Sequence, residues 1–197
     1  LKNISINYVE LDENQNKIST KQVPVEISLK RDEKALIKII PQNYTYTIDI
    51  IGYSYETEDY NVNVDLNENT ANIEKLSNLE ENQKELEDML KYDILEIYDF
   101  KGIDDTSYKV KIKNNSQKNL GNIILKVAEK NSDGEYISVS NISNNSTLKA
   151  KDFSALMLNS TDKENTLEII GYTYDDIENK SNIDIDLKTN TASIVRN

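Results

Sequence analysis

Apolar and polar residues alternate along most of this chain. In the segment YKVKIK (108–113), for example, three apolar residues alternate with three lysines. Successive side chains of an extended strand point to opposite faces, so this pattern is typical of a strand with one buried face. The same alternation is found in NVNVDL (61–66) and NIDIDL (182–187). The pattern therefore predicts a protein that is mostly β.

Turn-forming residues separate these alternating segments. The sequence NSDG (131–134) predicts a hairpin turn in which Gly134 adopts a positive φ. Asn69 and Asn190 are predicted to occupy left-handed positions in two short hairpin loops, because asparagine tolerates that conformation better than most residues. Within residues 94–197 these signals delimit eight predicted strands. They lie near 94–99, 107–113, 121–129, 135–142, 153–158, 166–174, 182–187 and 191–195.

The chain also contains an internal repeat. The hexapeptide IIGYSY (50–55) returns 119 residues later as IIGYTY. Residues 1–55 share 14 identities with residues 120–174 without a gap, and residues 61–73 share 7 identities with residues 182–194 after a two-residue insertion. Two matches in the same order indicate an internal duplication. The duplication argues against the alternative of one continuous barrel across both halves.

The repeat and the strand spacing together predict the architecture. Short strands with a turn signal roughly every 8 to 12 residues are the signature of an immunoglobulin-like β-sandwich. The chain is therefore predicted to form two tandem immunoglobulin-like β-sandwich repeats. Within the repeated strand, Ile51, Tyr53 and Tyr55 are expected on one face and Ile50 and Gly52 on the other. The glycine is expected to mark a β-bulge or a close backbone approach.

One segment departs from the alternating pattern. Residues 77–93 have apolar residues at helical spacing, and Ser77 and Glu80 form a capping box at their start. We therefore expect one α-helix between the repeats. The predicted domains are a first β-sandwich repeat at 1–73, a helical linker at 74–93 and a second β-sandwich repeat at 94–197.

The two repeats differ in what precedes them. Residues 94–119 lead into the second repeat, whereas nothing in the chain precedes Leu1. The first repeat is therefore expected to lack its first strands and to leave an unpaired sheet edge beside residues 3–10. Three partners are considered for this edge: residues upstream of Leu1, a second copy in a homodimer, and the helix between the repeats.

Composition narrows the classes of function. The chain has 35 acidic and 23 basic residues, a net charge of −12. This charge repels phosphate backbones and anionic lipid headgroups, so we expect no nucleic-acid binding. There is no cysteine and no histidine, which removes thiolate chemistry, disulfides and the commonest general base and zinc ligand. No apolar run is long enough to cross a membrane, so no membrane insertion is expected within this chain.

Two kinds of candidate site remain. Tyr53, Tyr55, Tyr172 and Tyr174 could form an aromatic ligand platform, or they could be residues at the rim of the core. The acidic loops at 12–16, 65–69 and 131–135 carry oxygen ligands of the kind that Ca²⁺ prefers, but Asp and Asn also favour turns without a metal. No catalytic motif is present, so the sequence predicts no catalytic, cofactor-binding or metal site and no enzyme.

Two segments carry a resemblance to a known family. INYVELDENQNKI (6–18) and LKVAEKNSDGEYI (125–137), the latter preceded by IKNNSQKNLGNI (112–123), resemble the bacterial extracellular immunoglobulin-like module called FxLYD. That family has a strand, an N-x-S sequence, a second strand, a polar turn with glycine and a further strand. The resemblance covers roughly half of each repeat. It implies a non-catalytic module on secreted or lipid-anchored proteins of Gram-positive bacteria.

These observations predict a non-catalytic ectodomain of a cell-surface or secreted lipoprotein. It would be extracellular, anchored to the cell envelope, and would serve as a binding or spacer module for protein interaction. The alternative is a carbohydrate- or cell-wall-binding accessory module of a larger enzyme. The expected partner is an unidentified protein or a cell-wall glycan, and the chain is expected to be a monomer or an edge-paired homodimer.

Overall fold

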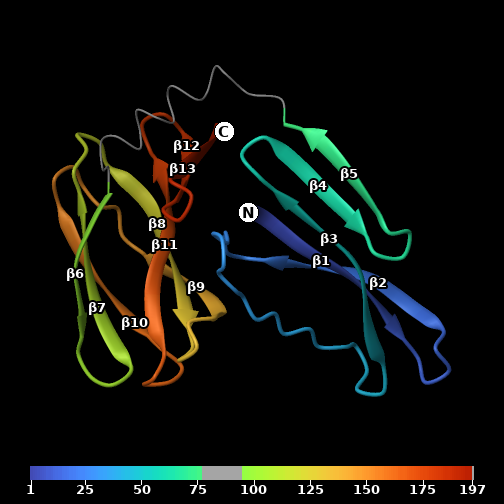
Figure 1. Ribbon diagram of the computed structural model, residues 1–197. Helices are drawn as coiled ribbons and strands as arrows, with labels where there is room; N and C mark the ends of the chain where they lie inside the picture. Colours follow the sequence, from blue (N-terminus) through green and yellow to red (C-terminus); the bar gives the residue numbers. More distant parts are fainter. Residues whose placement is uncertain (77–94, 197) are drawn as a thin grey trace. The chain divides into compact units, whose positions relative to one another are not determined.

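The regular structure of this protein is β throughout the residues that can be described. The structure is a computed structural model that describes residues 1–76 and 95–196. These residues form thirteen strands in three antiparallel sheets and contain no helix (Figure 1). The helix predicted at 77–93 lies outside them. None of the described residues forms a helix that is long and apolar enough to span a membrane.

The chain divides into two compact units, Leu1–Asn78 and Leu79–Asn197. Unit 1 contains one five-stranded sheet with the order β2-β1-β3-β4-β5, in blue to green in Figure 1. The last strand ends at Lys75, so residues 74–75, predicted as the start of the helical linker, belong to a strand. The strands are β1 (Lys2–Leu11), β2 (Lys17–Val25), β3 (Thr47–Glu56), β4 (Tyr60–Asp65) and β5 (Thr70–Lys75).

Unit 2 contains two sheets and all eight of the strands predicted for it. A three-stranded sheet has the order β10-β7-β6, and a five-stranded sheet has the order β13-β12-β11-β8-β9. The two sheets form separate layers in Figure 1. The strands are β6 (Leu95–Gly102), β7 (Ser107–Asn114), β8 (Leu120–Lys130), β9 (Tyr136–Asn144), β10 (Phe153–Asn159), β11 (Thr166–Asp176), β12 (Ser181–Asp186) and β13 (Thr191–Arg196).

Both sheets of unit 2 contribute to one hydrophobic core, so the unit is sandwich-like. The small sheet supplies Val110 and Ile112, which are completely buried, and the large sheet supplies Leu125, Tyr172 and Ile183, among others. Each of these residues occupies the inward position of an alternating strand, as the sequence pattern predicts. The apolar face of each sheet is therefore removed from water by the other sheet.

Unit 1 does not repeat this two-layer arrangement. Its sheet corresponds to the large sheet of unit 2, because β1 aligns with β8 and β3 with β11 at the offset of 119 residues. Residues 34–40 align with β10 but belong to none of the sheets in the described ranges. In unit 2, β10 pairs with β7, and the described part of unit 1 has no strand that corresponds to β7. The sandwich expected for the first repeat therefore stays a prediction, since the described residues of unit 1 show one sheet. The unpaired edge expected beside residues 3–10 is wrong, because β1 pairs with β2 on one side and with β3 on the other.

The backbone supports the duplication independently of residue identity. Positive φ angles occur at equivalent positions of the two units, even where the residue types differ. Gln15, with φ of 64°, stands where the second unit has Gly134, with φ of 77°. Asn69 and Asn190 both take the predicted left-handed conformation. The other equivalent pairs are Asn3 with Asn122 and Asp32 with Lys151.

The repeated glycine, Gly52 in unit 1 and Gly171 in unit 2, lies next to a β-bulge and at a close approach of two backbones, the two features expected of it. The pairing of β3 with β1 shifts at Ile51, and the pairing of β11 with β8 shifts at the equivalent residue, so a bulge precedes each glycine. A Cβ atom on Gly52 would lie 2.4 Å from the carbonyl oxygen of Val64, and one on Gly171 would lie 2.4 Å from that of Ile185. Glycine is therefore required because the neighbouring strand passes too close for any side chain.

The bulge also changes which residues share a face. In unit 2, Ile169 packs against the same core as Tyr172 and Tyr174. Ile169 is the counterpart of Ile50, which was expected to face away from the tyrosines. That expectation is wrong for the second repeat, because the extra residue of a bulge shifts the alternation by one position.

We predict that Gly171→Ala destabilises unit 2 by about 2 kcal/mol, because the added methyl group forces the backbones of two central strands apart. The midpoint of urea unfolding should fall accordingly. Gly102→Ala is the control, because a Cβ atom there would meet nothing closer than 3.8 Å. Equal midpoints for the two variants would show that the close approach is not a constraint.

Candidate functional site

The four tyrosines predicted as a ligand platform differ in burial between the units. Tyr172 and Tyr174 are 6% and 2% exposed and belong to the core of unit 2. Burial raises the pKa of the Tyr174 hydroxyl, and nearby Tyr172 and Asp176 add to the effect. Tyr53 and Tyr55 are only half-buried. The platform therefore has little exposed ring surface in unit 2, and at Tyr53 and Tyr55 it stays a prediction.

Both tyrosine pairs have the same geometry. The Tyr53 and Tyr55 rings are stacked, with centroids 6.3 Å apart and an angle of 15° between the planes. The Tyr172 and Tyr174 rings are 6.2 Å apart at 28°. Residues two positions apart on a strand lie on the same face, which brings the rings together. The difference in burial therefore comes from what covers each pair, and not from the strand that holds it.

The tyrosines of unit 1 are part of a larger apolar surface. Leu1 is 52% exposed, whereas its counterpart Leu120 is 1% exposed. Ile73 is 61% exposed, whereas its counterpart Ile194 packs against the core of unit 2. We call this side of the unit 1 sheet the open apolar face. We define it by the counterparts of core residues in unit 2, namely Leu1, Ile4, Ile6, Tyr8, Tyr53, Tyr55, Val62, Val64 and Ile73.

Not all of the open apolar face is exposed. Ile4, Tyr8 and Val62 are between 7% and 8% exposed, while Ile6 and Val64 are half-buried. The most exposed residues lie at the ends of the sheet. Exposed apolar surface of this kind is typical of a protein–protein interaction site. The open apolar face is therefore the candidate functional site.

A buried carboxylate occupies the same position in both units. Glu10 in β1 accepts hydrogen bonds from the Ser19 hydroxyl at 2.8 Å and from the backbone N–H of Gln42 at 2.8 Å. Its carboxylate also lies 2.9 Å from the ammonium group of Lys21. Hydrogen bonding to Lys21 holds the pKa of Glu10 below its usual value against the opposing effect of desolvation. The carboxylate thereby fastens the loop before β3 to the sheet.

Glu129 in β8 fastens the equivalent loop, before β11, to the sheet of unit 2. It accepts hydrogen bonds from the backbone N–H and the hydroxyl of Thr161, at 2.6 and 2.7 Å, and from the Asn165 amide at 2.8 Å. The Ser138 hydroxyl, equivalent to Ser19, donates at 3.2 Å. Desolvation by burial acts to raise the pKa of Glu129, but the hydrogen bonds outweigh it and hold the pKa below its usual value. These acids are therefore structural.

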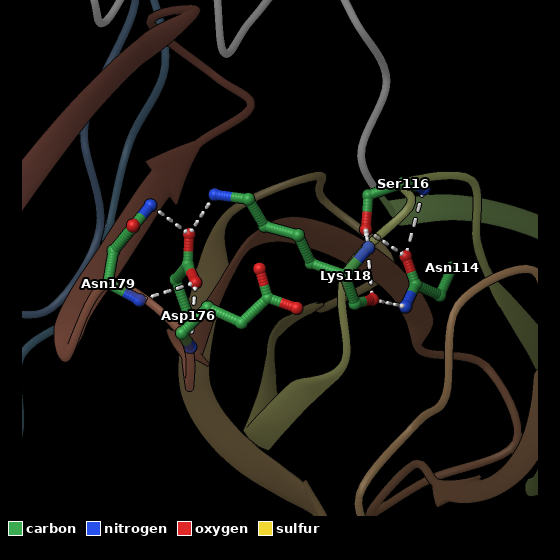
Figure 2. A network of polar contacts seen from close by, with 6 residues as sticks. Asn114, Ser116, Lys118, Asp176 and Asn179 are labelled. Atoms are coloured by element: carbon green, nitrogen blue, oxygen red, sulfur yellow. Dashed lines mark hydrogen bonds and ion pairs between the residues drawn. The ribbon is translucent and has the colours of Figure 1, made fainter.

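A further polar network joins two connections of unit 2 (Figure 2). The Lys118 ammonium and the Asn179 amide both donate to Oδ2 of Asp176, at 2.7 and 2.8 Å. Within the β7–β8 connection, the Asn114 amide donates to the carbonyl of Lys118 at 2.7 Å, and the Ser116 hydroxyl donates to Oδ1 of Asn114 at 2.7 Å. Desolvation opposes ionisation of Asp176, but Lys118 and Asn179 keep its pKa below the usual value. The network fixes the β7–β8 connection to the turn after β11.

A third polar cluster surrounds the buried ring of Tyr136. Its hydroxyl accepts a hydrogen bond from the Lys188 ammonium at 2.5 Å and donates one to Glu168 at 2.8 Å. Lys130 lies 2.7 Å from the same Glu168 oxygen. The hydroxyl thus connects a buried ammonium with a carboxylate, and the opposite charges compensate each other's desolvation. The sequence alone does not reveal this cluster, because its members come from four separate segments.

In the acidic loops, side-chain oxygens accept hydrogen bonds from backbone N–H groups and so stabilise the turns. Asp12 accepts backbone hydrogen bonds from Asn14 and Asn16, both at 2.8 Å. Oδ1 of Asp65 accepts from the backbone of Asn67 at 2.9 Å and of Glu68 at 3.0 Å. In the third loop, the side chain of Asn131 and the positive φ of Gly134 form the turn. Among the described residues, no group of three or more acidic side chains is arranged to hold a metal ion.

Comparison with known proteins does not identify a family. No protein-family model matches this chain, and no curated protein matches it in sequence. The resemblance to the FxLYD module therefore stays a prediction.

We predict that Glu129→Gln destabilises unit 2 at neutral pH by on the order of 1 kcal/mol, because the hydrogen bonds from Thr161 and Asn165 to a charged oxygen are stronger than those to a neutral amide oxygen. A depressed pKa in the folded state stabilises the fold above the unfolded pKa. This contribution is lost as the pH falls through the folded value. The difference between the wild type and the variant should therefore shrink from pH 7 toward pH 3.

Urea unfolding across this pH range measures the effect. Glu164→Gln, a change at an exposed position, is the control and should leave the stability nearly unchanged. A constant difference between the wild type and Glu129→Gln at all pH values would contradict the structural role of the ionised carboxylate.

For the acidic loops we predict no effect of calcium. Thermal unfolding should be the same in EDTA and in millimolar Ca²⁺, because Asp12 and Asp65 already bind backbone N–H groups. An ion that binds the folded state preferentially must raise the unfolding temperature. A rise of several degrees on adding Ca²⁺ would therefore overturn the prediction.

Proposed function

We propose that this chain is a non-catalytic ectodomain of a bacterial cell-surface or secreted lipoprotein, extracellular and anchored to the cell envelope, and that it binds protein. The open apolar face of unit 1 carries the proposal. Leu1 is exposed and the Tyr53–Tyr55 pair is half-buried where the second unit buries their counterparts. Ile73 is exposed where its counterpart Ile194 packs against the core. Exposed apolar and aromatic side chains on one face are characteristic of protein-interaction surfaces.

Unit 2 supports the proposal as a stable structural module. Its two sheets enclose one core, and in the described residues no buried side-chain nitrogen or oxygen lacks a hydrogen-bond partner. The buried acids Glu129 and Asp176 bind groups of the protein itself. We assign this unit a role as a spacer or support, in line with the non-catalytic nature of the module that the sequence resembles.

The strand order of unit 2 supports an immunoglobulin-like assignment. In immunoglobulin constant domains the first, second and fifth strands share one sheet, and the third, sixth and seventh share the other. Unit 2 divides its strands in the same way, with β6, β7 and β10 facing β8, β11 and β12. It differs in that β9 pairs with β8 and an additional strand, β13, follows β12.

A second candidate function is carbohydrate or cell-wall binding as an accessory to an enzyme. The stacked and half-buried rings of Tyr53 and Tyr55 favour it, because aromatic side chains combine an apolar face with a polar hydroxyl. We rank protein binding first, because the exposed apolar residues extend beyond the two tyrosines to the ends of the sheet.

The test is capture of cell-envelope components by the immobilised full chain. We expect a bound component that is lost when the envelope fraction is treated with protease and is kept when its glycans are digested. The double variant Tyr53→Ser/Tyr55→Ser should reduce capture by about tenfold, because buried tyrosines at an interface are common hot spots. Tyr44→Ser is the matched control, because Tyr44 is 95% exposed and lies outside the sheet.

The opposite pattern, with loss on glycan digestion alone, would favour the carbohydrate-binding alternative. Turnover of a polysaccharide or peptide that a single carboxylate substitution abolishes would contradict a non-catalytic function altogether.

A further inference from the structure

The small sheet of unit 2 has one face on the core and the other in water. Val110, Ile112 and Leu158 are 0%, 0% and 1% exposed, so the residues that alternate with them in β7 and β10 point away from the core. We call this side the outer face of the small sheet. It is defined by Lys109, Lys111 and Lys113 of β7 and by Phe153, Ala155 and Met157 of β10, which lie directly opposite one another in the register of the two strands.

The β10 half of the outer face is apolar where polar residues are expected. A sheet that packs on a core with one side normally presents polar side chains to water on the other. Phe153 is 65% exposed and Met157 is 50% exposed, and Ala155 between them is exposed as well. Exposed apolar residues are common singly, whereas a contiguous row of them points to an interaction surface.

The β7 half of the outer face carries only positive charge. The chain has a net charge of −12, yet the six residues of this face include three lysines and no acid. Lys109 is exposed, and Lys113 lies 3.7 Å from the carboxylate of Glu96 in an ion pair whose side chains are 43% and 47% exposed. Ion pairs this exposed contribute little, so Lys113 can exchange Glu96 for a carboxylate of a partner. Charge complementarity therefore favours an acidic partner.

The pairing of the sheet also limits the shape of the partner. Strand β7 pairs with β6 on one side and with β10 on the other, so its backbone groups are already used. A partner that lies flat on the outer face must satisfy its own backbone groups, as an α-helix does. Side chains four residues apart on a helix are separated by about 6 Å along the axis, close to the roughly 7 Å between alternate residues of a strand. A row of acids on a helix can thus follow the row of lysines.

We propose that the outer face of the small sheet binds an acidic amphipathic helix of a separate protein. The apolar stripe of the helix packs on Phe153 and Met157, and carboxylates beside the stripe pair with Lys109 and Lys113. An anionic glycan would meet the lysines but would leave Phe153 and Met157 in water. The proposal goes beyond the supporting role proposed for unit 2 and does not depend on the open apolar face of unit 1.

A designed helical peptide, with leucines along one stripe and glutamates along one side of it, is the probe. Labelled with a fluorophore, it should bind the full chain saturably, as measured by fluorescence anisotropy. A matched peptide with glutamine in place of every glutamate should bind at least about tenfold more weakly, because its attraction to the lysines is lost. No saturable binding of the acidic peptide, or equal binding of the two peptides, would overturn the proposal.

Two pairs of protein variants locate the binding site. Phe153→Ser removes an exposed apolar side chain from the outer face, and its control Val195→Ser removes one of similar exposure, 60%, from β13 of the other sheet. Lys109→Glu reverses a charge on the outer face, and its control Lys163→Glu makes the same change in an exposed loop. We expect Phe153→Ser and Lys109→Glu each to weaken peptide binding by at least about tenfold and the controls to leave it unchanged. Equal effects of a variant and its control would refute the site.

Other occupants of the outer face give different results, and each of them would overturn the proposal. If Lys109→Glu weakens binding and Phe153→Ser does not, the face binds anions and not an amphipathic helix. If the chain alone sediments as a dimer that Phe153→Ser dissociates, the occupant is a second copy. If the peptide binds only after Leu86→Ser and Leu90→Ser, residues 77–93 of the chain itself occupy the face. Capture through Tyr53 and Tyr55 tests the proposed function separately from all of these.

Discussion

An amphipathic sheet has to bury its apolar face, and the structure of this protein depends on how each unit meets that requirement. In unit 2 the sheet of β6, β7 and β10 covers the larger sheet, and Val110, Ile112, Leu125 and Ile183 are sealed from water. In unit 1 the equivalent sheet has no second layer among the described residues. The same local sequence pattern thus gives a closed core in unit 2, whereas in unit 1 it gives an apolar face that is buried at Ile4, Tyr8 and Val62 and exposed at Leu1 and Ile73.

The polar groups of the two units are arranged around this constraint. Glu10 and Glu129 are buried at equivalent positions, and each fastens the loop that leads into the next strand of the large sheet. Their hydrogen bonds compensate the desolvation of the charge, so the carboxylates remain ionised and rigid. Because these contacts are made within a single sheet and its adjoining loop, they survive in unit 1 without the second layer.

The open apolar face is the link that we propose between this architecture and function. Apolar side chains exposed at the ends of the sheet are energetically costly in water, and the protein partner proposed above would remove that cost by covering them. Exposed strand-like segments also invite uncontrolled association.

Much of this could be predicted from the sequence, because it depends on neighbouring residues. Alternation located the eight strands of unit 2, the repeated IIGY-x-Y string predicted the duplicated strand with its bulge, and Asn69, Gly134 and Asn190 predicted their own backbone conformations. Burial could not be predicted in this way. Tyr53 and Tyr172 have the same sequence context, yet Tyr53 is half-buried and Tyr172 lies in the core. The difference is that a second sheet covers Tyr172. The Lys188–Tyr136–Glu168 cluster and the roles of Glu10 and Glu129 likewise depend on strands that meet only after folding. The sequence by itself determined which residues point to the same side of each strand, whereas the tertiary structure decided what lies opposite them, because burial is a property of the partner surface.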